Sequence, residues 1–242
     1  MVKKAVMIYG APGAGKGTQA NLLAWSKGFL HFDTGKYLEQ IVHDPENQKN
    51  PKIKEQAKLF DTGILLDPSW VLNVVKEKTK EIASAGFSIV YSGSPRTTYE
   101  AFGDADLRGP NADKRGSKSV GLIDLLEKLY GKKNIFVILL KVRPKSSIFR
   151  NSNRKVCSVC ATPILYSEET HKHRNCPLCG GKLRTRTLDK PEIIKTRLKE
   201  YENRTKPITI ELKKHGYKIL EINGEPAPNK VHFAILKKLG IK

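Results

Sequence analysis

The chain has 242 residues and a formal net charge of +20, from 44 basic and 24 acidic residues. That length fits one α/β domain with insertions or two small domains, and no stretch approaches the ~20 apolar residues of a membrane span. The charge favours anionic partners such as nucleotides, nucleic acids or an acidic membrane surface, although a lysine-rich surface that serves only solubility would look the same. The N-terminal sequence MVKKAVMIYG lacks the long apolar segment of a signal peptide, so we expect a cytoplasmic protein.

The first half of the chain alternates apolar runs with helical patterns. Residues 2–9 predict a buried strand that leads into a glycine-rich turn. Residues 67–86 predict a long amphipathic helix, with a proline near its start and a glycine after its end. Further strands are expected at 28–34 and 87–91, and further helices at 16–27, 36–43 and 51–62.

The second half continues the same alternation. Residues 103–119 are polar and charged, as in an exposed loop or a partly disordered insertion. Strands that alternate with helices predict a parallel sheet covered on both faces, and the interruptions at 34–66 and 150–188 are candidates for small subdomains. Helices are expected at 120–131, 144–153, 190–216 (broken near Pro207) and 229–239, and strands at 134–142 and 217–224.

The sequence GAPGAGKGT, from Gly10 to Thr18, contains the phosphate-loop pattern G-x-x-x-x-G-K between a predicted strand and a predicted helix. Glycines let backbone N–H groups surround phosphate oxygens, and the helix adds the positive end of its dipole. Lys16 supplies a charge for the outer phosphates. Gly17 stands where the strict pattern has Ser or Thr, so Thr18 is the expected hydroxyl for the phosphate and metal. The alternative is a glycine-rich turn without a ligand.

The apolar run 87–91 stops abruptly at Ser92-Gly93-Ser94-Pro95-Arg96, as a buried strand does at a functional edge. In a protein with a phosphate loop, this strand end should face the nucleotide and its magnesium ion. A carboxylate is the usual residue for that position, and the sequence offers Ser92 instead. The question is therefore whether the phosphate chemistry is intact.

All four cysteines lie close together, in the pattern C-x2-C-x15-C-x2-C. This spacing matches a closed, structural four-thiolate zinc site, and it argues against a disulfide-rich secreted domain. Iron as the metal, His171 or His173 as a substitute ligand, and disulfides or free thiols are the alternatives. Few aliphatic residues surround the cluster, so the metal would hold the segment folded. The expected ligands are Cys157, Cys160, Cys176 and Cys179.

The sequences GAPGAGKGTQA (10–20), DTG, SGSPRT and RLKEYENRTKPI (197–208), with the cysteine insert, together resemble the adenylate kinases, more broadly the nucleoside monophosphate kinases, in the form with a zinc-bearing lid. The resemblance covers nearly the whole chain. It implies a doubly wound α/β P-loop core (1–33, 67–149 and 189–242), a monophosphate-binding insert (34–66) and a zinc-binding lid (150–188). The implied reaction is phosphoryl transfer from ATP to AMP with Mg²⁺, without a covalent intermediate.

The resemblance also implies roles for single residues. Arg96 matches an arginine that binds the acceptor phosphate. Arg150 and Arg154 match arginines that reach the donor nucleotide, and Arg186 and Arg197 match a pair that neutralises the transferring phosphoryl group. Any one of these arginines, taken alone, would be interpreted as a solvated surface residue. The implied catalytic set is Lys16, Arg96, Arg154, Arg186 and Arg197. The implied ATP contacts are Gly10, Ala11, Pro12, Gly13, Ala14, Gly15, Lys16, Gly17, Thr18, Arg150 and Arg154.

On the acceptor side, Thr34 matches the start of the monophosphate site, or is simply a helix N-cap, and Asp189 either anchors a lid arginine or is itself an N-cap. The implied acceptor contacts are Thr34, Gly35, Glu39, Gly93, Arg96, Glu100, Arg186 and Arg197.

Several positions depart from the family pattern. Ser92 and Lys36 replace two carboxylates that help hold the waters around magnesium. Glu39 replaces an arginine, Glu100 a glutamine and Ser94 an aromatic residue. Because the arginine clamp, the glycine loop and the lid are kept, we expect an active kinase. Magnesium would be held mainly by ATP phosphates, Thr18, water and Ser92.

Three other functions remain open from the sequence. The chain is a kinase for a nucleoside monophosphate other than AMP, a non-catalytic ATP-binding switch, or a nucleic-acid-binding protein that uses its zinc segment and basic charge. The last is weakened because Tyr166 is the only aromatic residue between 150 and 188. By analogy with the family, we expect ATP and AMP as ligands, no membrane partner and a monomer.

Overall fold

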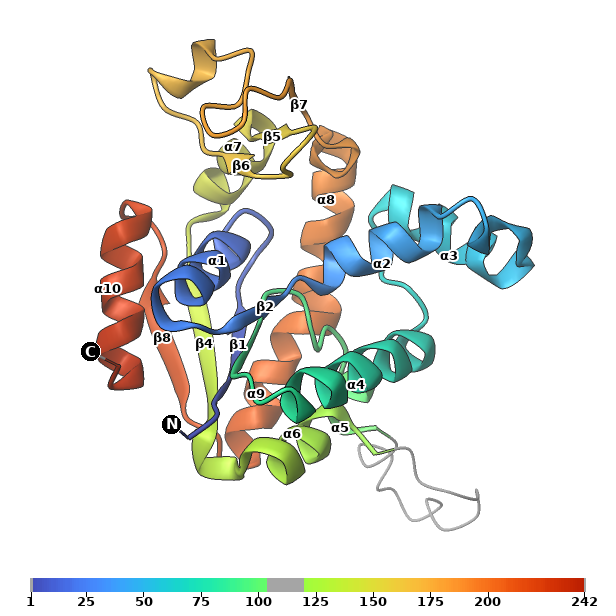
Figure 1. Ribbon diagram of the computed structural model, residues 1–242, viewed down its shortest axis with the longest axis vertical. Helices are drawn as coiled ribbons and strands as arrows, with labels where there is room; N and C mark the ends of the chain where they lie inside the picture. Colours follow the sequence, from blue (N-terminus) through green and yellow to red (C-terminus); the bar gives the residue numbers. More distant parts are fainter. Residues whose placement is uncertain (1, 104–119, 242) are drawn as a thin grey trace.

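The structure is a computed structural model that describes residues 2–103 and 120–241 (Figure 1). Its centre is a five-stranded sheet in the order β2-β3-β1-β4-β8, in which every neighbouring pair is parallel. All five strands lie within predicted runs, so the expected parallel sheet is confirmed. The predicted polar segment 103–119 lies outside the described residues from position 104 onward. The strands are β1 (Ala5–Tyr9), β2 (Leu30–Phe32), β3 (Ile89–Tyr91), β4 (Ile135–Lys141) and β8 (Ile219–Asn223).

Helices cover both faces of this sheet (Figure 1). Side chains alternate along β1, so that Met7 packs in one apolar core and Ile8 in the other. One core is closed by α1 (Lys16–Lys27) and α10 (Pro228–Leu239), and the opposite core by α4 (Pro68–Ser84), α5 (Thr98–Phe102), α6 (Leu122–Tyr130) and α9 (Lys206–Lys214). Two apolar layers around one parallel sheet make the doubly wound fold.

Helix ends follow local signals in the sequence. The Asp67 carboxylate accepts a hydrogen bond from the Trp70 backbone N–H at 2.8 Å, and Pro68 occupies the first turn, so α4 begins there. Helix α1 ends at Gly28, whose φ of 67° lies in the left-handed region that glycine tolerates. These caps fix where each connecting loop leaves the sheet.

Two helices and a short 3₁₀ turn project from the edge of the sheet beyond β2 (Figure 1). They are α2 (Thr34–His43), η1 (Asn47–Lys49) and α3 (Pro51–Thr62). The carboxylate of Asp33 accepts from the Lys36 backbone N–H, so Asp33 is the N-cap of α2. The interpretation of Thr34 as that cap is wrong, because Thr34 is already the first helical residue.

The cysteine segment follows α7 (Pro144–Asn153) and forms a small antiparallel sheet in the order β6-β5-β7. Its strands are too short for a sequence pattern to predict them. Among its described residues, the buried apolar cluster consists of Cys157, Ile164 and Cys176, with Leu183 packed against it. The elements are β5 (Lys155–Cys157), β6 (Pro163–Ile164), η5 (Thr170–Lys172) and β7 (Leu183–Arg184).

The long helix predicted at 190–216 is interrupted as expected. After η6 (Thr187–Asp189), α8 (Pro191–Glu200) runs into a π-helical turn, η7 (Tyr201–Thr205), and α9 follows with Pro207 in its first turn. The wider π turn accommodates a proline, which has no N–H to donate. The turn η4 (Lys132–Asn134) and helix α5 were not predicted. Within the described residues, no helix has the length and apolar character needed to cross a membrane.

Candidate active site

A cleft of about 1160 Å³ opens at the carboxyl ends of the sheet strands, between the projecting helices and the cysteine segment. Ligands of open parallel sheets bind at this edge. A smaller cavity of about 40 Å³ adjoins it under α2. The main cleft is lined by Gly10, Pro12, Gly13, Ala14, Gly15, Lys16, Gly17, Thr18, Gly35, Glu39, Gly93, Arg96, Arg150, Arg154, Arg186 and Arg197. The smaller cavity is lined by Thr34, Gly35, Gly93, Arg96 and Glu100.

The glycine loop depends on close backbone packing. A Cβ atom added to Gly13 would lie 2.6 Å from the Ser147 backbone oxygen, and one added to Gly10 would lie 2.7 Å from the Leu140 backbone oxygen. Both glycines have positive φ values, of 82° and 147°. Ala11 lines neither cavity, but its carbonyl accepts from Lys16. The loop therefore wraps the start of α1, as a phosphate-binding loop does.

The Lys16 side chain closes the loop. Its Nζ donates to the carbonyl oxygens of Gly10 at 2.7 Å and Ala11 at 3.0 Å. Burial, and then the charges of Arg96, Arg197 and Arg154, lower the pKa of Lys16 to about 7. The cations around Lys16 thus make the loop a place where added negative charge is favourable.

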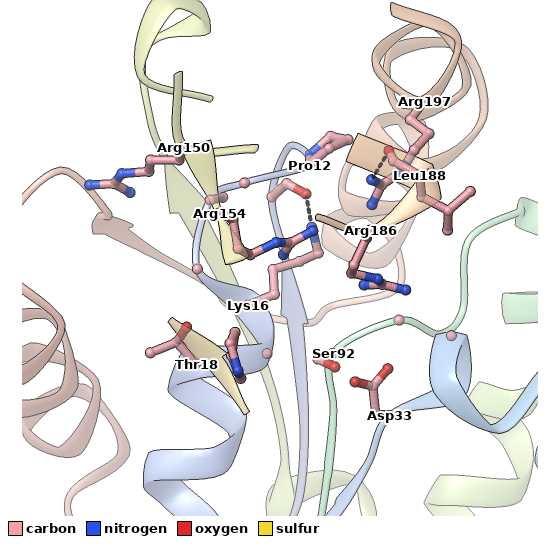
Figure 2. A pocket seen from close by; sticks show the side chains of 18 of the residues that line it. Pro12, Lys16, Thr18, Asp33, Ser92, Arg150, Arg154, Arg186, Leu188 and Arg197 are labelled. Carbon is pink, nitrogen blue, oxygen red and sulfur yellow. Dashed lines mark hydrogen bonds between the residues drawn. The ribbon is translucent and has the colours of Figure 1, made fainter. Parts of the chain in front are cut away.

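Three arginines converge on Lys16 from the chain around the cysteine segment (Figure 2). Arg154 holds the Asp189 carboxylate with two nitrogens, the shortest contact being 2.7 Å. Arg197 donates to the Leu188 carbonyl at 3.0 Å and contacts the same carboxylate at 3.4 Å. Asp189 is fully buried and anchors both, while the N-cap of α8 is Lys190, so the N-cap interpretation of Asp189 is wrong. Arg186 completes the group and pairs with Glu39 at 3.2 Å.

Arg150 points away from this group, as Figure 2 shows. Its two terminal nitrogens each donate at 2.8 Å, to the carbonyl oxygens of Gly224 and Glu225. Two carbonyls that hold one guanidinium fix its plane. Phe149 and Tyr166, which lie edge to face at 5.2 Å, also line the cleft. A fixed flat cation and aromatic rings are both groups on which a base can stack.

The residue directly after β3 is a serine, Ser92, where the family pattern has a carboxylate. Ser92 is buried, and its Oγ lies 2.8 Å from His31 Nε2. His31 Nδ1 lies 2.6 Å from the Asn21 amide oxygen, and burial lowers the pKa of His31. No sequence pattern singled out His31, Asn21 or Asp33, all of which line the cleft. A signal was present in GFLHFDT, where Asp33 directly follows a strand that leads to the same sheet edge.

Glu100 and Arg96 share the loop that follows β3. The Glu100 carboxylate is buried and accepts from the Arg96 backbone N–H at 2.9 Å and the Thr97 hydroxyl at 3.1 Å. Burial raises the pKa of Glu100. Arg96 Nε donates to the Gly93 carbonyl at 2.7 Å, which leaves its terminal nitrogens for a ligand. Glu100 thus holds this loop as well as lining the smaller cavity.

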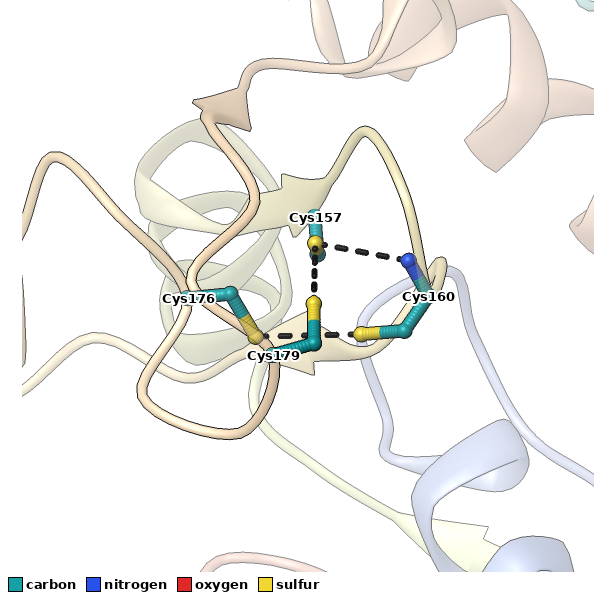
Figure 3. Close-up of side chains that lie close together, drawn as sticks. All are labelled: Cys157, Cys160, Cys176 and Cys179. Carbon is teal, nitrogen blue, oxygen red and sulfur yellow. Dashed lines mark hydrogen bonds between the residues drawn. The ribbon is translucent and has the colours of Figure 1, made fainter.

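The four cysteines form one cluster (Figure 3). Their Sγ atoms all lie within 4.8 Å of one another, and all four thiols are free, so the structure contains no disulfide among them. Ala161 has φ 55° and Gly180 φ 73°, so the residue after each C-x-x-C turn has a positive φ. His171 and His173 are not part of the cluster among the described residues. The donor set fits a tetrahedral zinc ion.

A parallel sheet, a phosphate loop and converging arginines under a cysteine-bearing segment define a P-loop phosphotransferase. Comparison with known proteins agrees. Residues 9–105 match the family model described as an AAA domain. The chain is 31% identical to an adenylate kinase of Caldicellulosiruptor bescii, over 98% of this chain and 99% of that protein. It is 30% identical to one of Lachnospira eligens, over 97% and 99% of the two chains.

The match to an adenylate kinase of Petrotoga mobilis is 29%, over 90% of this chain and 89% of that protein. The chain belongs to the adenylate kinase family, and it is an enzyme of the nucleoside monophosphate kinase class.

Proposed function

We propose that this protein reversibly transfers the terminal phosphoryl group of ATP to AMP, giving two ADP. The observation that carries the proposal is the convergence of Lys16, Arg96, Arg154, Arg186 and Arg197 on one cleft, which a smaller cavity adjoins. Phosphoryl transfer needs little covalent help from the protein, because positioning and charge neutralisation supply most of the rate. All five cations come from one chain, so a monomer suffices for this reaction.

On the donor side, the glycine loop holds the ATP phosphates through backbone N–H groups and Lys16. The base of ATP lies beside the fixed guanidinium of Arg150, with Phe149 and Tyr166 nearby. Residues 150–188 act as the lid, and residues 1–33, 67–149 and 189–242 as the core. Closing the lid brings Arg154 and Arg186, which flank the cysteine segment, onto the phosphates.

On the acceptor side, residues 34–66 hold AMP and Arg96 holds its phosphate. Two buried hydroxyls of the smaller cavity, Thr34 Oγ1 and Ser94 Oγ, have no hydrogen-bond partner among the described residues. Such groups are costly unless a ligand satisfies them, so they support a polar contact between this cavity and part of the acceptor nucleotide. Glu100 lines the same cavity and shapes the choice of base.

The chemical step is an in-line displacement. An oxygen of the AMP phosphate attacks the γ-phosphorus of ATP, and a new P–O bond forms. The bond from that phosphorus to the bridging β-oxygen breaks, and its electron pair stays on ADP. Lys16 and the arginines hold the three peripheral oxygens while charge shifts from one side to the other.

Magnesium fits the donor side of this cleft. Thr18, in the first turn of α1, and Ser92, at the end of β3, are the hydroxyls that would hold it or its waters. When bound, Mg²⁺ would neutralise part of the charge of the phosphates. In the lid, four thiolates would hold a structural Zn²⁺, because that segment buries little else.

The proposal is tested by incubating the protein with Mg²⁺, ATP and each of AMP, GMP, CMP and UMP, and separating the nucleotide products. We expect ADP from ATP and AMP, and loss of turnover in Lys16→Met. A preference for GMP would indicate that Glu100 changes which acceptor base is recognised, because the edge of guanine offers N–H donors to a carboxylate. Protein that binds ATP but turns over no acceptor would overturn the proposal in favour of an ATP-binding switch.

A further inference from the structure

The end of β3 has a hydroxyl, Ser92, where a carboxylate would serve the metal. We propose that Asp33, on the neighbouring strand end, supplies this carboxylate and, together with Ser92, holds the water shell of the Mg²⁺ bound to ATP. This inference rests on the proposed function, because it places metal-bound ATP in the cleft.

Sheet register brings the two residues together. Phe32 of β2 and Tyr91 of β3 are register partners in a parallel pair, so Asp33 and Ser92 are the next residues on adjacent strands. Residues opposite each other in a parallel pair present their side chains on the same side of the sheet. Figure 2 shows both side chains next to each other at the wall of the cleft, below Lys16.

Among the residues that the structure describes, Asp33 differs from the other carboxylates of the cleft because no cationic side chain lies within ion-pairing distance of it, although its charge acts on Lys16 and Arg96. In the described part of the chain, five carboxylates line the cleft, and four of them bond a basic side chain: Glu39 with Arg186, Asp61 with His43, Glu200 with Arg204, and Glu225 with Arg143. Within residues 2–103 and 120–241, Asp33 forms no ion pair. One of its oxygens accepts from the Lys36 backbone N–H at 3.3 Å, and the other accepts no hydrogen bond from the described residues.

The surroundings of Ser92 orient it as an acceptor. With the Asn21 amide oxygen facing His31 Nδ1 at 2.6 Å, that nitrogen carries the proton of a neutral imidazole. His31 Nε2 is then the acceptor for the Ser92 hydroxyl at 2.8 Å. The hydroxyl proton is committed to His31, and the lone pairs of Ser92 Oγ remain for a metal-bound water. Mg²⁺ keeps several waters in proteins, and carboxylates and hydroxyls accept from them.

A role of Asp33 as a helix cap alone can be distinguished from a role in holding the water shell of Mg²⁺. Asp33 caps α2, and asparagine caps helices as well as aspartate does. Asp33→Asn therefore keeps the cap and the shape of the side chain but removes the charge. If capping were the whole role, metal dependence would not change.

The test is calorimetric titration of the full-length protein with the non-hydrolysable imido analogue of ATP, once in Mg²⁺ and once in EDTA. We expect Asp33→Asn to reduce the tightening of binding by Mg²⁺ about tenfold, or 1.4 kcal/mol. Metal-free binding should be unchanged or slightly tighter, because a negative charge near the phosphates is gone. The matched control is Asp61→Asn, which removes another cleft carboxylate that is paired with His43 and more than half exposed.

An Asp33→Asn variant that keeps the wild-type ratio of the two dissociation constants would overturn the proposal. Ser92→Ala provides an independent measurement, and it should reduce the same ratio by a smaller factor. Failure of the wild type to form ADP from ATP and AMP would contradict the proposed function instead. The binding measurement could still be interpreted in that case, because it requires no turnover.

Discussion

At the scale of single residues, the cleft is dominated by like charges. Arg96, Arg154 and Arg197 all lower the pKa of Lys16, and burial and the other arginines also lower the pKa of Arg197. The carboxylate of Asp189 offsets positive charge at the two arginines that it binds, Arg154 and Arg197. A triphosphate removes this repulsion when it binds, so part of the binding energy comes from charges that the fold already holds together.

Lys16 should take up a proton when ATP binds. Its pKa is about 7 in the ligand-free protein, against 10.5 for a free lysine, and phosphates favour the charged form. Between about pH 7 and 10.5 the ligand-free lysine is mostly neutral and the bound lysine charged. Calorimetry at pH 8, in two buffers of different ionisation enthalpy, should show uptake approaching one proton, falling toward zero at pH 6. Lys16→Met should show none, and equal uptake in the variant would contradict the assignment.

Glu39 should compete with the acceptor phosphate for Arg186. The pair at 3.2 Å is part-exposed, with Glu39 38% exposed, and is therefore worth at most about 1 kcal/mol. Glu39→Gln frees Arg186, so we expect the KM for the acceptor to fall about two- to fivefold with kcat little changed. Glu202→Gln, which breaks the exposed pair with Lys206, is the control. An increased KM would show instead that Glu39 contacts the acceptor directly.

At the scale of elements, the cysteine segment is a small sheet without a core of its own. Its strands are two or three residues long, and its described apolar cluster contains two of the four cysteines. The first C-x-x-C turn is held by hydrogen bonds to sulfur, from the Val159 and Cys160 backbone N–H groups to Cys157 Sγ at 3.4 Å. A metal ion held by the four thiolates would therefore be the main source of order in this element.

Removing the metal should unfold the segment locally. We expect one zinc ion per chain, and after chelation a loss of hydrogen-exchange protection over 155–184 but not in β1 or β4. Turnover should fall at least tenfold, because Arg154 and Arg186 flank the unfolded part. Adding zinc back should restore both signals. Protection of 155–184 that survives complete metal removal would contradict this prediction, and elemental analysis separates zinc from iron.

At the scale of the whole molecule, two small units face each other across the cleft (Figure 1). The polar contacts between them include the Glu39–Arg186 pair and a 3.4 Å hydrogen bond from Lys36 Nζ to the Ala161 carbonyl. Both lie at the rim of the cleft, where such contacts contribute little free energy. Nucleotide phosphates, not these contacts, should therefore stabilise the closed arrangement.

Small-angle X-ray scattering tests whether nucleotide phosphates stabilise the closed arrangement. A bisubstrate analogue, two adenosines joined through a chain of phosphates, should reduce the radius of gyration of the protein. Adenosine alone, which lacks phosphates, should leave it unchanged. An equal radius with and without the analogue would show that closure does not depend on phosphate, and would remove the support for assigning 34–66 and 150–188 as moving units.

Local patterns in the sequence determined much of this protein. The apolar runs predicted all five strands of the parallel sheet, because buried parallel strands need continuous apolar side chains. GAPGAGKGT predicted the phosphate loop, and the cysteine spacing predicted the four-sulfur cluster, because both depend on residues close together in the chain. The helix predicted at 36–43 begins two residues earlier, at Thr34, and its N-cap is Asp33, since Asp33 and Thr34 are both good caps and only the backbone shows which one caps.

Only the tertiary structure decided which distant residues meet. Asp189 joins Arg154 to Arg197, 35 and 8 residues away, and no local pattern distinguishes an anchor from a helix cap. His31 reaches Ser92 across 61 residues because β2 and β3 pair in parallel, and the same register places Asp33 beside Ser92. Sequence showed that a carboxylate was missing after β3. The pairing of β2 with β3, which is set by packing over the whole sheet, showed that the carboxylate of Asp33 lies beside Ser92.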